Sequence, residues 1–444
     1  MMIGDRKSFE KIAASHEHDG SLFFKSDVPI HFGLAPGRLD VMGGFADYSA
    51  SHVLEIPIRE CTFVAVQETE LNAWEIISLD SDGAPTRSFE TTGTECLSWS
   101  YSEAAGKLDD PGSAWAAYII GVLLVLRQEC DVPLPRGMRV LIATDVPEGR
   151  GVSSSASLEV AVAAAICDLT ETVVDPIVVA ALCQKAENIV ARAACGIMDQ
   201  MTVICGRRDC LMLLECRPAR IARYVNIPTD LTVWGIDSGV SHSIAGSTYH
   251  DVRVGARMGL RIVQSLPDLQ QLSHLAELSP EEFHRIEEHL PEEMEGRQYL
   301  EKYGNWSDAA TTVDAETVYR VRVPTRHPVL ENDRVLAFAE HLGGEALDGD
   351  YLGGLMNRSH QAYSQCGLGS DETDLLVELV NRNRERGLFG AKASGGGSGG
   401  TVIVLGDAQA SDAIREVASE YENLMGYSPY IFSGSRDGVA DLFR

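Results

Sequence analysis

A glycine- and serine-rich turn between an apolar strand and an apolar helix is the feature that most constrains this chain. The stretch Pro147–Ser157, PEGRGVSSSAS, follows the strand-like run Met138–Val146 and precedes the helix-forming run Leu158–Ile166. Unpaired N–H groups and the positive end of the helix dipole make such a helix start an anion site. Because the stretch lacks the lysine and the spacing of the common nucleotide P-loop, two interpretations stay open. It is either a different phosphate loop or an ordinary serine-capped turn.

The length of the chain predicts two domains. At 444 residues the chain is longer than the size at which a single hydrophobic core usually stops growing. A turn-rich break at residues 217–230 separates two strand-like runs, 211–215 and 231–237. We therefore place the boundary in this break and expect domains at residues 1–225 and 226–444.

The charge of the chain excludes some partners. The formal net charge is −28, which would repel nucleic acids and anionic membranes, so we expect neither as a partner. An anionic substrate must then be captured locally, by N–H groups, arginines or a metal ion. The N-terminus has no apolar signal region, the apolar runs are too short for a bilayer, and the 10 cysteines form no C-x-x-C pair. We therefore expect reduced thiols and a cytoplasmic protein.

Charged residues inside apolar stretches are candidate site residues. Arg38, Asp40 and Asp47 lie within the mostly apolar region His31–Ile58, and Glu187 and Asp199 lie within a later apolar segment. Burying such groups costs free energy unless each charge is paired or has a function. The residues alone leave two explanations open, an internal salt bridge or a site that holds a cation.

Two further features are ambiguous by themselves. Trp115 and Tyr118 have an i,i+3 spacing on a predicted helix, which suits either the core or a wall that stacks on a nucleotide base. The glycine-rich stretch Gly395–Gly400 precedes the apolar strand-like run Thr401–Leu405. A glycine cluster in this position indicates a loop that lets the backbone approach a ligand closely, rather than a linker.

Several separated stretches together resemble the GHMP small-molecule kinases, and within them the galactokinase branch. Pro147–Ser157 resembles the phosphate loop of that family, Arg38–Tyr48 its sugar signature and Gly395–Thr401 its third motif. CQKAE at Cys183–Glu187 and CGIMDQ at Cys195–Gln200 also resemble galactokinases. The resemblance implies an α+β fold of two domains. An N-terminal ribosomal-S5-like α/β domain and a C-terminal ferredoxin-like α+β domain would hold the active site between them.

The resemblance also implies a phosphoryl-transfer site for ATP, Mg²⁺ and a sugar. Asp199 would be the catalytic base or orienting acid at the sugar hydroxyl, and Arg38 would keep it ionised and neutralise phosphoryl charge. Glu187 and a serine hydroxyl, Ser154 or Ser155, would hold Mg²⁺. The other implied contacts are with the phosphates for Gly149, Gly151, Ser153, Ser154 and Ser155, with adenine for Trp115 and Tyr118, and with the sugar for Gly44, Phe45, Asp47, Tyr249, Gly396 and Gly397.

One departure from the galactokinase pattern concerns the substrate. Galactokinases have a Glu-His pair where this chain has Gly44-Phe45. The resemblance implies that this pair binds the exocyclic 6-hydroxyl of galactose. Without it, this hydroxyl would be buried unpaired, at about 1–3 kcal/mol. L-Arabinopyranose has the same ring hydroxyl arrangement and lacks the hydroxymethyl group, and the sequence also resembles the kinase domains of L-arabinokinases. Alternatively, Gly44-Phe45 is only a turn followed by a core phenylalanine.

The sequence therefore predicts an ATP-dependent sugar-1-kinase that converts L-arabinose to L-arabinose 1-phosphate. The alternatives are a galactokinase and a non-catalytic galactokinase-like sugar sensor. We expect a monomer or a homodimer. Replacing Gly44-Phe45 with Glu-His is expected to raise activity on galactose relative to L-arabinose.

Overall fold

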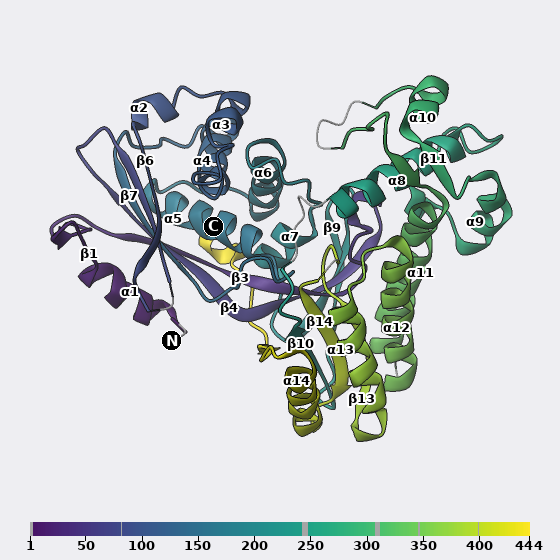
Figure 1. The fold of residues 1–444 in the computed structure, drawn as a ribbon. Helices are drawn as coiled ribbons and strands as arrows, with labels where there is room; N and C mark the ends of the chain where they lie inside the picture. The colour runs from purple at the N-terminus through teal and green to yellow at the C-terminus, as the bar shows by residue number, and fades with distance from the viewer. Residues whose placement is uncertain (1–2, 81, 242–246, 307–310, 345–346, 398) are drawn as a thin grey trace.

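A computed structural model describes residues 3–80, 82–241, 247–306, 311–344, 347–397 and 399–444. Its two main β-sheets, each covered by helices, lie side by side in Figure 1. The larger sheet is built from the first half of the chain and the smaller sheet from the second half. A third group, of helices and two short strands, projects beyond the smaller sheet (Figure 1).

The larger sheet has seven strands in the order β6-β5-β7-β4-β8-β9, with β3 paired to β4. Its strands are β3 (His31–Met42), β4 (His52–Glu68), β5 (Trp74–Leu79), β6 (Pro85–Thr91), β7 (Met138–Thr144), β8 (Cys210–Glu215) and β9 (Arg220–Asn226). The β5–β7 pair is parallel and the other pairs are antiparallel. The predicted strand before the glycine- and serine-rich turn is therefore confirmed as β7.

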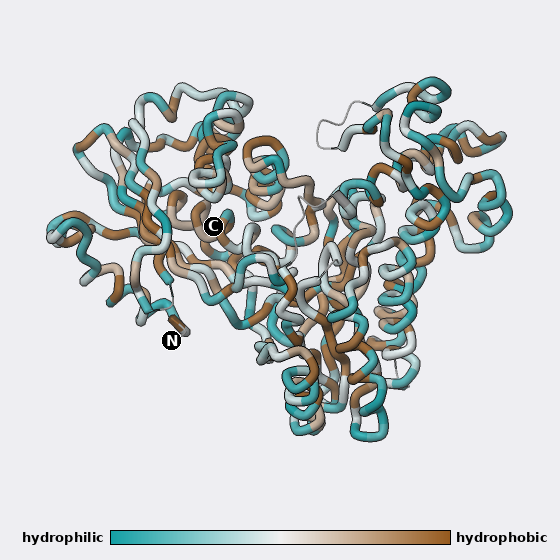
Figure 2. The backbone as a smooth tube through the Cα atoms, in the orientation of Figure 1, coloured by the Kyte–Doolittle hydropathy of each residue, from teal (hydrophilic) through white to brown (hydrophobic). Residues whose placement is uncertain are grey.

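Both faces of the larger sheet are buried. Four helices cover one face: α4 (Ala116–Cys130), α5 (Ser154–Leu169), α6 (Pro176–Ile189) and α7 (Met198–Cys205). Helix α1 (Arg6–Ser15) covers the other face, so Val64 on β4 contacts the core under the helices while its neighbour Phe63 contacts the core under α1. Figure 2 shows the hydrophobic segments, in brown, where the helices meet the sheets. Helix α5 confirms the predicted helix and is buried almost throughout, which places its N-terminus deep in the molecule.

The smaller sheet is antiparallel, with the strand order β13-β14-β10-β15. Its strands are β10 (Leu231–Asp237), β13 (Leu388–Ala393), β14 (Thr401–Asp407) and β15 (Ile431–Ser433). The helices packed around it are α11 (Arg322–Leu342), α12 (Gly349–Cys366), α13 (Asp371–Arg382) and α14 (Ser411–Met425). The loop between β13 and β14 carries the glycine-rich third motif.

The projecting group contains α8 (Ser247–Gln264), α9 (Pro280–Ile286), α10 (Gly296–Tyr303), β11 (Glu293–Glu295) and β12 (Val318–Arg320). The short elements that remain are β1 (Glu17–His18), β2 (Ser21–Leu22), α2 (Gly93–Cys96), α3 (Tyr101–Lys107) and the 3₁₀ turns η1 (Asp47–Ser49), η2 (Leu275–Glu277), η3 (Glu287–His289), η4 (Arg384–Arg386) and η5 (Ala440–Phe443). Helix α11 contacts both α8 and the strands of the larger sheet, so it connects the projecting group to the rest of the molecule.

The change from the larger to the smaller sheet falls between β9, which ends at Asn226, and β10, which begins at Leu231. The predicted boundary at residues 225–226 therefore falls at the end of β9, and we propose the domain boundary close to it, in the connection to β10. The last residues cross back over this boundary, because η5 packs against α5 and Phe443 is buried in the core under the helices of the larger sheet. Within the ranges given above, none of the helices has both the length and the apolar character needed to cross a bilayer.

Candidate active site

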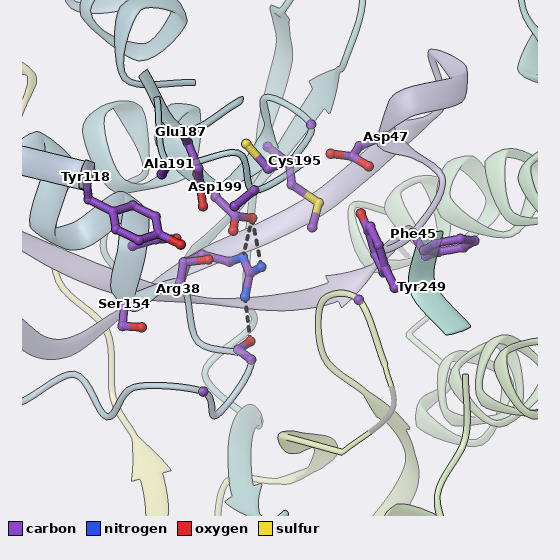
Figure 3. Close-up of a pocket in the computed structure, with 18 of the residues that line it drawn as sticks. Arg38, Phe45, Asp47, Tyr118, Ser154, Glu187, Ala191, Cys195, Asp199 and Tyr249 are labelled. Carbon is purple, nitrogen blue, oxygen red and sulfur yellow. Dashed lines mark hydrogen bonds and ion pairs between the residues drawn. The ribbon is translucent and has the colours of Figure 1, made fainter. Parts of the chain in front are cut away.

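A cavity of about 320 Å³ brings most of the predicted site residues together. The first half of the chain supplies Arg38, Phe45, Asp47, Tyr118, Gly149, Gly151, Ser153, Ser154, Ser155, Glu187 and Asp199, and the second half supplies Tyr249 and Gly396. Figure 3 shows Arg38 and Asp199 near the centre of the cavity, with Ser154 and Tyr118 toward one end and Phe45 and Tyr249 toward the other. Of the predicted residues, Gly44, Trp115 and Gly397 do not line this cavity.

Arg38 on β3 connects the candidate base to the phosphate loop. Its Nε and Nη2 atoms donate to Asp199 Oδ1 at 2.9 and 2.7 Å, and its Nη1 atom donates to the Gly151 carbonyl oxygen at 2.7 Å (Figure 3). Burial opposes the charge of Arg38, but Asp199 and Glu55 outweigh it and raise its pKa above the ordinary value. The guanidinium is therefore a permanent cation between the carboxylate and the loop. The salt bridge that the sequence left open exists, and it lies inside the cavity.

The phosphate loop has the backbone geometry of an anion site. Gly149, Gly151 and Ser153 have φ values of 69°, 68° and 61°, so left-handed residues alternate with others and turn N–H groups inward. Ser153 is the N-cap of α5 but its side chain makes no capping hydrogen bond, and its buried hydroxyl has no partner within the described residues. The first N–H groups of α5 and this hydroxyl are thus available to a bound anion.

Glu187 on α6 is suited to hold a divalent cation. It is 1% exposed, and burial raises its pKa to about 7, opposed by hydrogen bonds from Cys195, Ser155 and Gln200. A carboxylate that burial destabilises in this way would be stabilised by a cation, and carboxylate and hydroxyl oxygens suit Mg²⁺. Ser155 hydrogen-bonds to Glu187, and both Ser154 and Ser155 line the same cavity. The donor set fits Mg²⁺, although the described residues contain no group of three acidic, histidine or cysteine ligands.

The aromatic pair Trp115 and Tyr118 lies at a second opening beside the phosphate loop. A cavity of about 230 Å³ is lined by both rings and by Leu158, and it shares Tyr118, Gly149, Ser154 and Ser155 with the first cavity. Trp115 also packs against the core of the larger domain. The cavity also has polar and charged lining residues, among them Thr62, Arg87 and Glu148. A space with aromatic rings and a few polar groups that opens onto a phosphate loop is a suitable place for a nucleotide base.

The opposite end of the cavity carries Asp47, Phe45 and Tyr249. Asp47 is 5% exposed and contacts Gly196, where a Cβ atom would lie 1.5 Å from Asp47 Oδ2, so only glycine fits there. The Phe45 ring packs against Tyr249 with 5.1 Å between ring centroids, and its φ of 60° is unusual for a bulky residue. Such backbone strain concentrates at functional sites. Phe45 lines the cavity, and it is also 1% exposed and part of the buried apolar cluster that contains Tyr48 and Tyr249.

Gly44 lies behind this wall and has no room for a side chain. A Cβ atom there would lie 1.9 Å from Asp40 Oδ2 and 2.3 Å from the Tyr363 hydroxyl oxygen. The Gly44 half of the expected Glu-His replacement would therefore require Asp40 and Tyr363 to move, and its effect on activity stays a prediction. Gly397 is likewise structural, since its Cβ atom would lie 2.5 Å from the Leu368 carbonyl oxygen.

Several residues that support the site were missed from the sequence. Lys392 Nζ donates to Asp40 Oδ2 at 3.0 Å, and both side chains are fully buried. The Gly44 and Gly395 N–H groups donate to the same carboxylate, at 3.1 Å each. This buried pair therefore connects the sugar signature on β3 to the third motif. An acid in an apolar stretch was visible at Asp40, but its partner lies 352 positions away.

His327 on α11 is a second missed residue. Its ring lies 6.0 Å from the Phe45 ring, centroid to centroid, and burial lowers its pKa to about 4. It is therefore neutral at neutral pH and acts as part of the packing behind Phe45. No spacing in the sequence relates these two residues.

Comparisons with known proteins agree with this geometry. The family model described as GHMP kinases N terminal domain matches residues 117–207, and the model described as GHMP kinases C terminal matches residues 344–423. An L-arabinokinase of Arabidopsis thaliana is 38% identical over 98% of this chain, which spans 48% of that protein. A galactokinase of Chloroflexus aggregans is 30% identical, with 86% of each chain covered.

Solved structures show the same fold. A crystal structure of Lactococcus lactis galactokinase complexed with galactose has a TM-score of 0.75, at 22% identity, and covers 97% of each chain. A mevalonate kinase structure has a TM-score of 0.57, at 15% identity. A two-domain α+β fold, a glycine-rich phosphate loop and matching family models together define a small-molecule kinase. This chain belongs to the GHMP kinase family.

Proposed function

We propose that this chain transfers the γ-phosphoryl group of ATP to the anomeric hydroxyl of L-arabinose, with Mg²⁺. The Phe45 ring at the sugar end of the cavity is the observation that supports this substrate, because it offers no hydrogen bond to a 6-hydroxyl. The relatives named above, an L-arabinokinase and a galactokinase, support a sugar-1-kinase. The chain spans about half the length of the L-arabinokinase, and the proposal concerns the kinase reaction alone.

The residues of the cavity can perform this reaction as follows. Asp47 and Tyr249 bind ring hydroxyls, and the N–H groups of the phosphate loop with α5 hold the phosphates. Asp199 orients the anomeric hydroxyl and accepts its proton as the new oxygen–phosphorus bond forms and the bond to the ADP oxygen breaks. Arg38 neutralises the charge that develops on the transferred group. Mg²⁺, which Glu187 and Ser155 would hold, supplies charge neutralisation on the ATP phosphates.

The choice of sugar is tested by kinetics with a sugar panel. A hydroxymethyl group buried against Phe45 would leave its hydroxyl unpaired, which costs about 1–3 kcal/mol. We therefore expect kcat/KM for L-arabinose to exceed that for galactose by about 10- to 100-fold. ADP release with purified protein, ATP and Mg²⁺ measures this. A preference for galactose would contradict the pocket argument, and sugar binding without turnover of any sugar would indicate a sensor.

The two substitutions of the expected Glu-His replacement, Gly44→Glu and Phe45→His, should have different effects. Phe45→His should raise kcat/KM for galactose relative to L-arabinose by about fivefold, because one hydrogen bond to the 6-hydroxyl is recovered. Gly44→Glu should instead lower the free energy of unfolding by at least about 1–3 kcal/mol, because Asp40 and Tyr363 fill the space. Urea unfolding and the two kinetic ratios check both. An unchanged ratio in Phe45→His would show that this ring does not select the sugar.

The pH dependence of sugar binding reports on Asp47. Burial and the charge of Asp199 raise the pKa of Asp47 from 3.8 to about 6. Because the ionised carboxylate is the better acceptor for sugar hydroxyls, affinity should fall by about tenfold from about pH 7 to about pH 5. Without sugar, the free energy of unfolding should change in the opposite direction. It should fall as pH rises from about 4 to about 6, because in this range Asp47 is protonated in the folded state and ionised in the unfolded state. Calorimetry of sugar binding checks the first effect, and Asp47→Asn should remove it.

The ligands and location of the chain are proposed on similar grounds. ATP and a sugar are its small-molecule partners, and the ten cysteines are all free thiols, which a reducing compartment preserves. We therefore propose a cytoplasmic enzyme. Its assembly as a monomer or a homodimer stays a prediction, which sedimentation would test.

A further inference from the structure

A second cavity lies behind the sugar end of the active site. Its volume is about 560 Å³, larger than the 320 Å³ of the active-site cavity, and it lies among η1, α8, η2 and α10. Cavities of about 300–1,000 Å³ are typical for small-molecule ligands. None of the roles discussed above uses this cavity.

The lining of the second cavity is basic in an acidic protein. It contains the arginines Arg217, Arg257 and Arg261 and the histidine His274, and no aspartate or glutamate among the residues that the structure describes. The whole chain has a formal net charge of −28. Guanidinium groups present planar N–H donors that match phosphate oxygens. This cluster of basic side chains in an otherwise acidic protein favours binding of an anion.

One side of the cavity is an aromatic wall made of Tyr299, Tyr303 and Trp306. The Tyr299 ring lies 5.3 Å from the Tyr303 ring and 5.8 Å from the Trp306 ring, measured between centroids. Arg257 adds a cation 5.8 Å from the centroid of Trp306. Such surfaces bind the flat face of a ring. The ligand should therefore carry both a phosphate and a ring.

Tyr48 connects the second cavity to the sugar site. It lines the second cavity, it is 7% exposed, and its hydroxyl oxygen has no hydrogen-bond partner within the described part of the chain. Its ring lies 5.2 Å from the ring of Phe45, centroid to centroid, and the Arg253 guanidinium carbon lies 5.6 Å from the centroid of the Tyr48 ring. Helix α8 also spans both sites, with Tyr249 at one cavity and Arg257 and Arg261 at the other.

We propose that the second cavity binds an organic phosphate whose ring packs on the aromatic wall, and that this binding alters the sugar site through Tyr48. Its phosphate contacts the arginines of the cavity and its ring is that of a sugar or a nucleotide base. Binding of this ligand to the second cavity does not depend on which sugar the active site phosphorylates. If the function proposed above were wrong, the proposed binding site would still stand.

Calorimetry on the full chain tests the site, with saturating MgADP present to occupy the active site. The probes are inorganic phosphate, glucose 1-phosphate and UMP, which separate phosphate alone, a sugar ring and a base. One ring phosphate should bind at least about tenfold more tightly than inorganic phosphate. Tyr303→Ala should remove that advantage. Equal or undetectable binding of all three probes would overturn the proposal.

A charge reversal gives the matched comparison. Arg261→Glu should weaken the ring phosphate at least about tenfold, and its side chain is exposed, with a single hydrogen bond to Gln264, so the fold should tolerate the change. Arg285→Glu makes the same charge change at an exposed position of α9 outside the cavity and should have no effect. Equal weakening in both variants would overturn the site.

The connection through Tyr48 is tested separately. With the ring phosphate bound, the dissociation constant of the sugar should shift by about fivefold, and an unchanged constant would overturn the connection through Tyr48.

Discussion

Asp199→Asn is expected to lower kcat by about 10³-fold while leaving sugar binding nearly intact. Asparagine keeps the shape of the side chain and can still accept the hydrogen bonds of Arg38, which aspartate now receives at 2.7 and 2.9 Å. It cannot take the proton of the anomeric hydroxyl. The measurement is ADP release for kcat and calorimetry for the sugar dissociation constant.

Asp47→Asn is the matched control for this prediction. Asp47 lines the sugar end of the same cavity but makes no hydrogen bond to Arg38, so the same chemical change there should raise the sugar KM more than it lowers kcat. The two variants therefore separate the chemical step from binding. A near-normal kcat in Asp199→Asn would show that this carboxylate is not the catalytic base.

Lys392→Met is expected to destabilise the folded protein by about 3–5 kcal/mol, because Asp40 would become a buried charge without its partner. Asp40 and Lys392 are both fully buried, and their Oδ2 and Nζ atoms are 3.0 Å apart. The Gly44 and Gly395 N–H groups also donate to Asp40, but neither carries the positive charge that Lys392 supplies. Urea unfolding measures the loss of stability.

The exposed pair of Lys107 and Glu95 provides the control for Lys392→Met. Their side chains are 50% and 53% exposed, so Lys107→Met should change the free energy of unfolding by less than about 1 kcal/mol. Adding Asp40→Asn to Lys392→Met should restore part of the stability, because it removes the unpaired charge. A double variant as unstable as the single one would mean that packing, not charge, explains the loss.

Local features of the fold were predictable from the sequence. The strand β7, the phosphate loop and α5 follow one another along the chain, and the glycine positions 149 and 151 have the left-handed backbone that their composition suggests. The candidate base Asp199 and the candidate metal ligand Glu187 were found because a charge in an apolar stretch is costly. Such signals need no knowledge of distant partners.

Features that depend on distant residues were not predictable. In the sequence, Gly44 stands where galactokinases have one of two polar residues that contact the sugar. In the structure, Asp40 and Tyr363 pack against Gly44 and leave no room for a side chain. The hydrogen bond between Ser155 and Glu187 joins the start of α5 to α6, and no spacing in the sequence indicates it. The second cavity depends on segments far apart in the chain, and no motif marks it.

The sequence by itself determined the family resemblance, the phosphate loop, the charged residues of the site and the absence of a polar pair at Gly44-Phe45. These properties are local, because they depend on neighbouring residues and on the cost of burying a charge. Only the tertiary structure decided that Arg38 connects Asp199 to the loop, that Lys392 neutralises Asp40 and that Phe45 packs against Tyr249 at one end of the cavity. Each of these is a contact between distant segments, and the contacts of Asp40 with Lys392 and of Phe45 with Tyr249 also join the two halves of the chain.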